Sequence, residues 1–344
     1  MQPAEQKQDS GHKTVTMKAQ AFWIRAPGDG VLHTETLPEP EAGMVQVRTL
    51  FSGISRGTES LVFQGRVPVS EAGRMRAPFQ AGDFPGPVKY GYANVGVVES
   101  GPPDLEGCHV FCLYPHQDRY VVPATAVFPL PNQLPPERAV LAANMETAVN
   151  GLWDAAPRIG DRIAVIGAGT TGMLTAALAA RIPGTQVQLI DIDPAKAEAA
   201  ETLGLTLVQP EAAQGEVDLV IHATGYPDAL RQALDLAGFE ATVLEMSWYG
   251  AQDVPAPLGG AFHAKRLTLA SSQVGSISPA RRARWSNGDR LSLALRLLQD
   301  SRFDALITGE CAFQDLPMTL RHLSAGPPGT LCYRVRYETS GLTS

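Results

Sequence analysis

Apolar runs of two kinds alternate along residues 163–248. Short, largely β-branched runs such as RIAVI and VDLVI have the length and composition of buried strands, and the longer segments between them place apolar residues at helical spacing. Strands and helices that alternate in this order form parallel β-α-β units with right-handed crossovers. The pattern therefore predicts a doubly wound parallel sheet over residues 156–289.

A different pattern occupies residues 18–131, where short β-like runs such as AQAFWI, VQVRTLF and DRYVVP are broken by Gly and Pro. Short runs with frequent turn residues are typical of a compact, partly closed antiparallel sheet or barrel. Two later runs, LITGECAF and TLCYRVRY, are expected to return to this unit. We therefore predict an α/β fold in which a second, β-rich domain is built from residues 17–155 and 290–344.

The balance of charge excludes one class of partner. The 344-residue chain has a formal net charge of -7 and a sequence pI of about 5.5. A nucleic-acid-binding surface needs an excess of Lys and Arg on one face, so nucleic acid is not expected as a partner. The one basic cluster is Arg281, Arg282 and Arg284 beside Trp285, and a solvated loop or helix face is favoured there over a contact with a ligand phosphate.

The chain is expected to be a cytoplasmic protein with no membrane partner. Its most apolar stretch, residues 173–180, is far shorter than the ~20 residues that cross a bilayer. Residues 1–16 have no apolar core, which predicts a disordered leader rather than a secretory signal. Four cysteines without a framework spacing fit a reducing compartment.

A glycine-rich motif follows the first apolar strand of the alternating region and opens a predicted helix. Gly167, Gly169 and Gly172 stand at the spacing G-x-G-x-x-G, with Thr170 and Thr171 between the last two. The first glycine allows a tight turn, the second lets the backbone approach a pyrophosphate, and the third lets the helix pack on the strand. Free N–H groups and the positive end of the helix dipole attract the phosphates. The motif predicts a Rossmann domain that binds a dinucleotide.

An acidic residue indicates which dinucleotide is expected. Asp191 ends the second strand, where a carboxylate accepts hydrogen bonds from ribose hydroxyls and repels a 2′-phosphate, and no Arg lies in the turn up to Pro194. Asp193 is the alternative acid, and its other interpretation is a helix N-cap before Pro194. A further strand ends at Thr224 and Gly225, which we add to the cofactor site. We expect NAD rather than NADP.

The order of these segments resembles the medium-chain dehydrogenase/reductase superfamily, the zinc-type alcohol dehydrogenases and their relatives, over residues 17–337. The resemblance rests on GISRGTE, KYGYANVGVV, CHVF, PATAVFPLP, IGAGTTG, LIDIDPAKAEAAETLG and DLVIHATG. It implies a GroES-like catalytic domain formed by both ends of the chain, a Rossmann domain between them, and a cleft where nicotinamide meets substrate. The run SGISRGTES is similar to the zinc-lacking type found in bacteriochlorophyllide hydroxyethyl dehydrogenases, but it does not assign a chlorin substrate.

The chain departs from zinc members at the positions of the zinc ligands. Ser55 stands where they carry a Cys, Tyr92 stands where they carry the His of Gly-His-Glu, and the third ligand position falls within a residue or two of Ala143. The nearest carboxylate is that of Glu146. A catalytic zinc needs three deprotonatable protein ligands and one open position, which Ser, Tyr and Ala do not provide. We therefore predict a protein without a metal.

A different metal site is conceivable from Cys108, His109, Cys112 and His116, which follow one another closely. If CHVFC is a strand, the two cysteines lie ~13 Å apart at ~3.3 Å per residue, which is too far for one tetrahedral centre. We interpret both cysteines as thiols of the core.

Without zinc, another group must polarise a carbonyl or take a hydroxyl proton. Tyr92 is the first candidate, and Lys89 is expected to lower its pKa by charge proximity; the alternative is an aromatic ring that fills the vacated metal site. Glu59 stands near the position of a carboxylate beside the metal of zinc members, and otherwise caps or salt-bridges a helix. Ser55 and His116 complete the candidate catalytic residues, with His116 as a proton shuttle, although a lone loop His is more often on the surface.

Three more residues are assigned by position. Arg56 follows Ser55, where some alcohol dehydrogenases place a basic residue on the pyrophosphate, and the resemblance implies the same role here. Ser247 and Trp248 end a strand at the carboxyl edge of the sheet, where ligands bind. They are expected to flank the nicotinamide, and a core position is the alternative for Trp248.

These features favour a zinc-independent, NAD-dependent oxidoreductase that interconverts an alcohol and a carbonyl on a small or medium metabolite. The alternative from another class is a non-catalytic NAD-binding sensor or structural protein. The alternative among enzymes is an NADPH-type enoyl or quinone reductase, against which Asp191 weighs. The resemblance also implies a homodimer joined through the edge of the Rossmann sheet.

Overall fold

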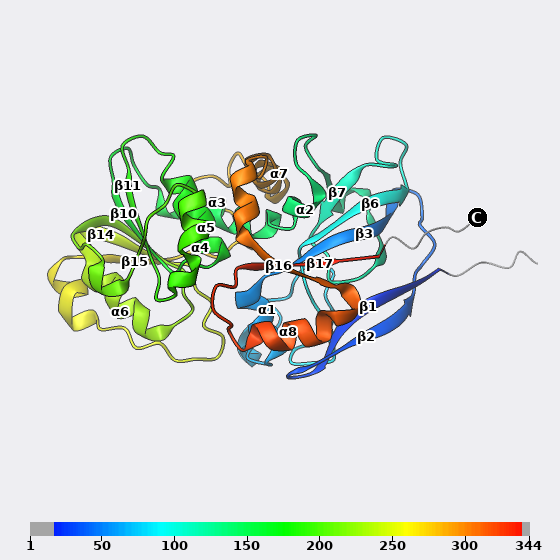
Figure 1. Ribbon diagram of the computed structural model, residues 1–344, viewed down its shortest axis with the longest axis horizontal. Coiled ribbons are helices and arrows are strands. Elements are labelled where there is room, and N and C mark those ends of the chain that lie inside the picture. Colours follow the sequence, from blue (N-terminus) through cyan, green and yellow to red (C-terminus); the bar gives the residue numbers. More distant parts are fainter. Residues whose placement is uncertain (1–16, 339–344) are drawn as a thin grey trace, which may run out of the picture.

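The structure, a computed structural model of the chain, describes residues 17–338. The predicted leader, residues 1–16, lies outside the described residues. Figure 1 shows a parallel sheet with its helices at one end of the molecule, in green to yellow, and a β-rich part at the other end, in blue to cyan. The predicted α/β fold class, with one parallel and one largely antiparallel part, is confirmed.

The parallel sheet has six strands in the order β12-β11-β10-β13-β14-β15. The strand order reverses at β10, so the switch point of the sheet lies between β10 and β13. Ligands of such sheets bind beside the switch point, at the carboxyl ends of the strands. The strands are β10 (Arg162–Ile166), β11 (Gln186–Ile190), β12 (Leu207–Val208), β13 (Val217–His222), β14 (Ala237–Glu245) and β15 (Thr268–Ser271).

Helices cover both faces of this sheet, which is why β10 is a continuous apolar run. Ile163, Ala164 and Val165 are fully buried, and α4 presents apolar residues around most of its circumference because it packs between α3 and the sheet. No helix within residues 17–338 is long and apolar enough to span a membrane. The helices of this part are α3 (Ala142–Ala155), α4 (Thr170–Ala179), α5 (Ala197–Thr202), α6 (Pro227–Leu236) and α7 (Asn287–Leu297).

The β-rich part consists of a seven-stranded sheet, in the order β16-β17-β3-β6-β7-β9 with β8 also paired to β3, and a four-stranded sheet, β2-β1-β5-β4. β17 pairs antiparallel with β3, with Tyr333 opposite Ile54, so segments from both ends of the chain share one sheet. The strands are β1 (Lys18–Ala26), β2 (Asp29–Thr36), β3 (Met44–Ile54), β4 (Ala81–Gly82), β5 (Val88–Lys89), β6 (Asn94–Ser100), β7 (His109–Cys112), β8 (Arg119–Pro123), β9 (Val127–Pro129), β16 (Ile307–Ala312) and β17 (Cys332–Arg336).

Three shorter helices, α1 (Arg56–Phe63), α2 (Pro136–Ala139) and α8 (Leu316–Ser324), complete the described elements that matter here. The two parts also meet outside the linking helix α3. The division that the sequence suggests between residues 289 and 290 falls inside α7, which packs on α3. The loop after β14 reaches the end of α1, where the N–H of Ala251 donates to the carbonyl of Arg66 at 3.2 Å. The ends of α1 and β14 are therefore held close to each other.

Candidate active site

The glycine turn between β10 and α4 meets a separate geometric demand at each glycine. Gly167 has φ of 105°, and a Cβ there would lie 2.8 Å from the carbonyl oxygen of Ala223. A Cβ at Gly172 would collide with the carbonyl oxygen of Gly167, so only glycine lets α4 approach the turn. A Cβ at Gly169 would meet nothing within 4 Å. Open space in front of the first N–H groups of a helix fits an incoming pyrophosphate.

Asp191, directly after β11, is held in place from three sides. Its Oδ2 accepts hydrogen bonds from the N–H of Ala168 at 2.7 Å and from Lys196 Nζ at 2.8 Å, and its Oδ1 accepts from the N–H of Asp193 at 2.8 Å. The carboxylate thus has a fixed orientation beside the glycine turn. Lys196 was not among the sequence candidates, although its place five residues after Asp191 could have pointed to it.

Asp193 is the N-cap before Pro194, which was its alternative interpretation. Its surroundings also show where Arg56 lies. Its carboxylate accepts the N–H of Ala195 at 3.1 Å and the N–H of Gly329 at 2.6 Å. Burial opposes ionisation of Asp193, but these two N–H groups and the charges of Lys196 and Arg56 hold its pKa below the ordinary value. Arg56 in the first turn of α1 therefore lies close to the turn after β11, on the side expected for the cofactor.

The carboxyl ends of β13 and β14 carry a polar cluster around His222, whose side chain is fully buried. His222 Nδ1 lies 2.7 Å from Glu245 Oε2, which also accepts the hydroxyl of Tyr249 at 2.8 Å. His222 Nε2 lies 2.9 Å from the hydroxyl of Thr224. The sequence did not indicate Glu245 or Tyr249, because no motif links a residue at the end of one strand to its partner on the next.

Ser247 and Gly225 lie together at this edge of the sheet. The N–H of Gly225 donates to Ser247 Oγ at 3.1 Å, and the N–H of Ser247 donates to Glu245 Oε1 at 2.7 Å. Trp248, the next residue, packs partly buried against the core of the β-rich part. The core position that was the alternative for Trp248 thus describes its packing.

Ser55, Tyr92 and a residue of α3 come together on the β-rich side. The side chains of Ser55 and Thr58 lie near the Tyr92 hydroxyl and favour its ionised form. Asn144 Nδ2 lies 3.5 Å from Ser55 Oγ and 3.1 Å from Thr171 Oγ1. The residue beside Ser55 is therefore Asn144, one position beyond the expected Ala143, and its amide joins Ser55 to the glycine turn.

Glu59 and His116 form a buried pair directly behind Ser55. Glu59 Oε2 lies 2.8 Å from His116 Nε2, and the two side chains are 3% and 1% exposed. Glu59 Oε1 accepts the N–H of Ser55 at 2.8 Å, which is the helix-capping role named as its alternative. His116 does not lie on the surface, as a loop His usually does. Its buried ring lies between Glu59 of α1 and Ser52 of β3.

Lys89 does not act on Tyr92 as expected. Its Nζ is bound to Glu35 Oε2 at 2.7 Å and to Gln117 Oε1 at 2.8 Å. The pKa of Tyr92 is raised well above its ordinary value, first by burial and then by the charge of Glu59, with an opposing effect of its hydrogen bonds to Ser55 and Thr58. The expectation of a lowered pKa was wrong because β5 directs Lys89 toward other partners.

The donors around Ser55 do not fit a catalytic zinc. The side chains at the three expected ligand positions are a hydroxyl at Ser55, a phenol with a raised pKa at Tyr92 and an amide at Asn144, none of which is a zinc ligand of the usual kind. The nearby carboxylate of Glu59 is already bound to the N–H of Ser55 and to His116. Glu146, the nearest carboxylate in sequence, is bound to Arg290 Nε at 3.0 Å instead. Among residues 17–338, no group of three or more His, Cys, Asp and Glu is placed to hold a metal ion.

Comparison with known proteins gives relatives but no family model that matches. The chain is 26% identical over 206 residues to (R,R)-butanediol dehydrogenase of Bacillus subtilis, which covers 55% of each chain. It is 28% identical over 221 residues to 2-desacetyl-2-hydroxyethyl bacteriochlorophyllide A dehydrogenase of Rhodobacter capsulatus, which covers 59% of this chain and 65% of the relative. The chain thus spans 55% and 65% of the length of these two curated relatives.

Solved structures match over a larger share of the chain. An alcohol dehydrogenase of Escherichia coli CFT073 in complex with NADH gives a TM-score of 0.74 at 17% identity and covers 93% of this chain and 99% of the other. A protein of Sinorhizobium meliloti 1021 described as a zinc-binding dehydrogenase, bound to NADP, gives 0.74 at 19% identity with coverage of 93% and 99%. At such identities the likeness establishes the fold. The chain has the two-part fold, GroES-like and Rossmann, of the dehydrogenase structures that it matches.

Proposed function

We propose that this protein is a zinc-independent, NAD-dependent oxidoreductase that interconverts an alcohol and a carbonyl on a small or medium metabolite. One observation carries the proposal: the amide of Asn144 joins Ser55 to Thr171, so the candidate proton-transfer groups lie next to the turn expected to hold the cofactor. The names of the two curated relatives, both dehydrogenases, support the same reaction class.

The residues of the Rossmann part fit a dinucleotide. The open space at Gly169 and the N–H groups of Thr170 and Thr171 would receive the pyrophosphate, with the Arg56 guanidinium as its counter-charge. Asp191 would accept the ribose hydroxyls with the lone pairs that its present hydrogen bonds leave free.

The polar groups at the ends of β13 and β14 would flank the nicotinamide. Thr224, Gly225 and Ser247 form one hydrogen-bonded edge there, fixed from behind by His222 and Glu245. Bound NAD supplies the hydride acceptor, and NADH supplies the hydride donor, for the reacting carbon. The protein's own contribution is to hold the substrate carbon at that edge and to manage one proton.

Tyr92 is the proposed group for that proton. Its raised pKa keeps the phenol neutral at physiological pH, so that it can donate a hydrogen bond and then a proton to a carbonyl oxygen. Ser55 and Thr58 orient its hydroxyl, and the charge of Glu59 behind them stabilises the protonated form. In the reverse direction the Tyr92 oxygen takes the proton of the alcohol while the phenol passes its own proton to water.

The choice of NAD over NADP rests on Asp191. Its carboxylate repels a 2′-phosphate, while the ammonium of Lys196 at 2.8 Å reduces that repulsion. Titrations of NAD and NADP followed by protein fluorescence test the choice. We expect NAD to bind more tightly, and tighter binding of NADP would overturn this part of the proposal.

Zinc independence is tested separately. The purified protein should turn over at the same rate before and after dialysis against a chelator, and metal analysis should find less than one zinc per chain. One zinc per chain that is lost together with activity contradicts the proposal and would require ligands other than Ser55, Tyr92 and Asn144.

An assay of alcohols and aldehydes by the absorbance of NADH separates an enzyme from a sensor. Turnover of any member of the panel supports the oxidoreductase. Tight binding of NAD without turnover would favour the non-catalytic NAD-binding protein. The enoyl or quinone reductase requires activity with NADPH on a conjugated carbon–carbon double bond or a quinone, and is tested in the same assay.

A homodimer through the edge of the Rossmann sheet is part of the proposal. β15 is the outermost strand of the parallel sheet, and three of its four residues are exposed in the single chain. An unpaired strand edge of this kind is suited to pairing with a second copy. Light scattering after size-exclusion chromatography should give twice the mass of 36.7 kDa, and the mass of one chain would contradict it.

A further inference from the structure

A pocket at the end of α3 lies outside the proposed active site. Its volume is about 470 Å³, which is within the ~300–1,000 Å³ of small-molecule sites. Leu152, Pro157 and Ile182 form an apolar wall, and Arg281 and Arg284 supply two positive charges. The sequence pattern favours a solvated face for this basic cluster, and the structure adds the apolar pocket beside it.

The two arginines belong to a hydrogen-bonded turn that is packed on α3. The N–H of Arg281 donates to the carbonyl of Ser278, a residue that is 2% exposed, at 2.8 Å. The N–H of Trp285 donates to the carbonyl of Arg281 at 3.1 Å, and the Trp285 ring lies 5.0 Å from the Trp153 ring of α3. The backbone that carries Arg281 and Arg284 is therefore held against the end of α3.

No carboxylate offsets the charges of these arginines in the part of the chain that the structure describes. Arg290, at the start of α7, is bound to Glu146 at 3.0 Å, whereas no salt bridge within residues 17–338 involves Arg281 or Arg284. Arg281 Cζ lies 5.7 Å from the centroid of the Trp153 ring, which holds the guanidinium over the aromatic wall of the pocket. Its N–H groups remain able to bind a carboxylate or a phosphate.

Two other charges near the pocket are weaker. Asp154, in the last turn of α3, is bound to Ser272 Oγ at 2.6 Å. The carbonyl end of α3 opposes an anion, but a helix end carries only about half a charge, against two whole charges on the guanidinium groups. In a chain of net charge -7 the pocket is therefore a local region of positive potential.

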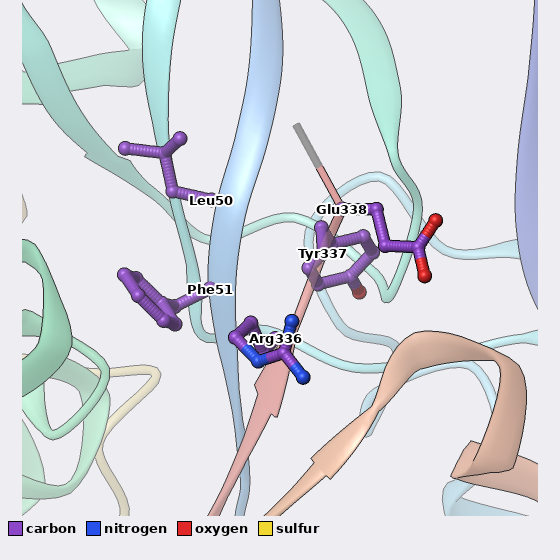
Figure 2. Close-up of a pocket in the computed structure, with 5 residues that line it drawn as sticks. All are labelled: Leu50, Phe51, Arg336, Tyr337 and Glu338. Carbon is purple, nitrogen blue, oxygen red and sulfur yellow. The ribbon is translucent and has the colours of Figure 1, made fainter. Parts of the chain in front are cut away.

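A pocket of about 400 Å³ on the β-rich part differs in this respect. Figure 2 shows the carboxylate of Glu338 and the guanidinium of Arg336 among the side chains that line it. Arg336 Nε lies 3.3 Å from Glu310 Oε1, so its charge is already paired. An anion that enters this pocket meets a carboxylate. Of the two pockets, the one at the end of α3 is the one suited to an anion.

The pocket at the end of α3 is also separate from the expected cofactor site. Ile182 follows the last turn of α4, whereas the glycine turn precedes the first turn of the same helix. α4 has 10 residues, which span ~15 Å at ~1.5 Å per residue. An anion in this pocket is therefore not the pyrophosphate of the dinucleotide.

We propose that this pocket binds a small organic anion that has an apolar body and one carboxylate or phosphate head. The head pairs with Arg281 and Arg284, and the body lies against Leu152, Pro157 and Ile182. Burial of the body adds a hydrophobic contribution that an inorganic ion lacks. The inference does not depend on the proposed oxidoreductase function, because binding at this site involves no turnover.

Isothermal titration calorimetry with four probes tests the two halves of the site. Octanoate and octyl phosphate, below their micelle concentrations, carry both head and body, whereas acetate carries only a head and 1-octanol only a body. We expect saturable binding of one octanoate or octyl phosphate per chain, and affinities about tenfold or more lower for acetate and 1-octanol. The tighter of the two complete probes identifies the preferred head.

Substitutions of neighbouring arginines locate the head. Arg281→Gln and Arg284→Gln each remove one charge from the pocket and should weaken octanoate about tenfold. Arg282→Gln is the matched control, because Arg282 belongs to the same turn and does not line the pocket. It should bind octanoate as the wild type does. All three side chains are exposed, so the fold is expected to tolerate these changes.

A second pair of variants tests the sign of the charge at one exposed position of the wall. Ala156 has φ of 48°, a left-handed conformation that Asp and Asn adopt more readily than most residues. Ala156→Asp places a negative charge at the pocket and should weaken octanoate about tenfold. Ala156→Asn has nearly the same shape without the charge and should leave the affinity unchanged.

Several results would overturn the proposal. They are wild-type affinity for octanoate in both Arg281→Gln and Arg284→Gln, equal affinities for octanoate and 1-octanol, and displacement of octanoate by saturating NAD. Light scattering tests a second copy of the chain as the occupant: a wild-type dimer that both arginine variants convert to monomers would mean that this face joins two chains. A protein that binds octanoate as described but oxidises no alcohol leaves the inference intact and counts against the proposed function alone.

Discussion

The glycine turn and the Tyr92 site lie next to each other but are assembled in opposite ways. The turn and its carboxylate come from one continuous segment, residues 163–191, in which strand, turn, helix and strand follow directly. The Tyr92 site combines α1, the loop before β6, the loop after β7 and α3, and its buried pair Glu59 and His116 is 57 residues apart. A site built from one continuous segment can be predicted from the sequence. A site built from distant segments depends on how those segments pack in the folded chain.

The two regions also differ in what they leave open. At the turn, the position of Gly169 faces empty space, which a ligand can enter. Around Tyr92 the polar groups already satisfy one another, through Ser55, Thr58, Glu59 and His116. The turn is therefore built to receive a charged group, and the Tyr92 site is built to keep its own hydroxyl neutral and oriented.

The largest effect is expected from one substitution made at two glycines of the turn. Gly172→Ala places a Cβ against the carbonyl oxygen of Gly167, so we expect a clear drop in melting temperature and about a 100-fold loss of NAD affinity, or no binding. Gly169→Ala meets nothing within 4 Å, so the melting temperature should stay unchanged while NAD affinity falls about tenfold. Differential scanning fluorimetry and NAD titration check both. Equal melting temperatures in the two variants would contradict the division of roles.

Next in size is the effect of Tyr92→Phe. It removes the proposed proton donor and keeps the ring, so kcat should fall about 100-fold while NAD affinity stays unchanged. Steady-state kinetics and NAD titration on the same preparation measure the two quantities. Tyr90→Phe is the matched control, because Tyr90 is a buried neighbour whose ring centroid lies 5.9 Å from that of Tyr92. If Tyr92→Phe keeps full turnover, Tyr92 is not the proton donor, and its ring only fills the space of the absent metal site.

The fold could be predicted from the sequence because periodic apolar patterns express it locally. The run RIAVI followed by three glycines predicts β10, the turn and α4, and each forms as expected. Asp193 could be recognised as a cap for the same reason, since Pro194 follows it directly.

The Tyr92 site could be predicted only in part, because its contacts join distant segments. The resemblance supplied Ser55 and Tyr92 by position, but Asn144 rather than Ala143 presents the polar group. The partners of Lys89 and the burial of His116 follow from tertiary packing that no local pattern records. Sequence reasoning therefore named the residues more reliably than it named their neighbours.

The β-rich part should lose stability in alkali before the Rossmann part does. Burial raises the pKa of the phenols of Tyr90, Tyr114, Tyr120 and Tyr337 above the ordinary value. Because each folded pKa lies above the unfolded value of ~10, the stability that depends on neutral phenols is fully present below ~pH 10. It is lost above that pH, by about 1.4 kcal/mol per pH unit for each group.

Urea unfolding at pH 8 and above about pH 10 measures this loss, and hydrogen exchange locates it. Tyr120→Phe should reduce the loss, since it removes one of the buried phenols of the β-rich part. In the Rossmann part Tyr226 is 71% exposed, and Tyr249 is the one phenol with a raised pKa, through partial burial and the charge of Glu245, so the effect there is smaller. If amide hydrogens of β10 and β13 exchange before those of β3 and β8 in alkali, the Rossmann part is the less stable one and the prediction is contradicted.

The smallest effects are expected at Asp191 and Lys196, where the two charges oppose each other in cofactor choice. Asp191→Ala removes a hydrogen-bond acceptor for the ribose, and such a hydrogen bond contributes about 1 kcal/mol to binding. The affinity for NAD should therefore fall about fivefold, while the affinity for NADP should not fall. Lys196→Met removes the ammonium and keeps the chain length, so the carboxylate repels a 2′-phosphate more strongly and only NADP should weaken. Parallel titrations of both nucleotides measure the ratio of affinities. A ratio that both variants leave unchanged would mean that the pair only orders the turn after β11, and that cofactor choice is made where the β-rich part meets the adenosine.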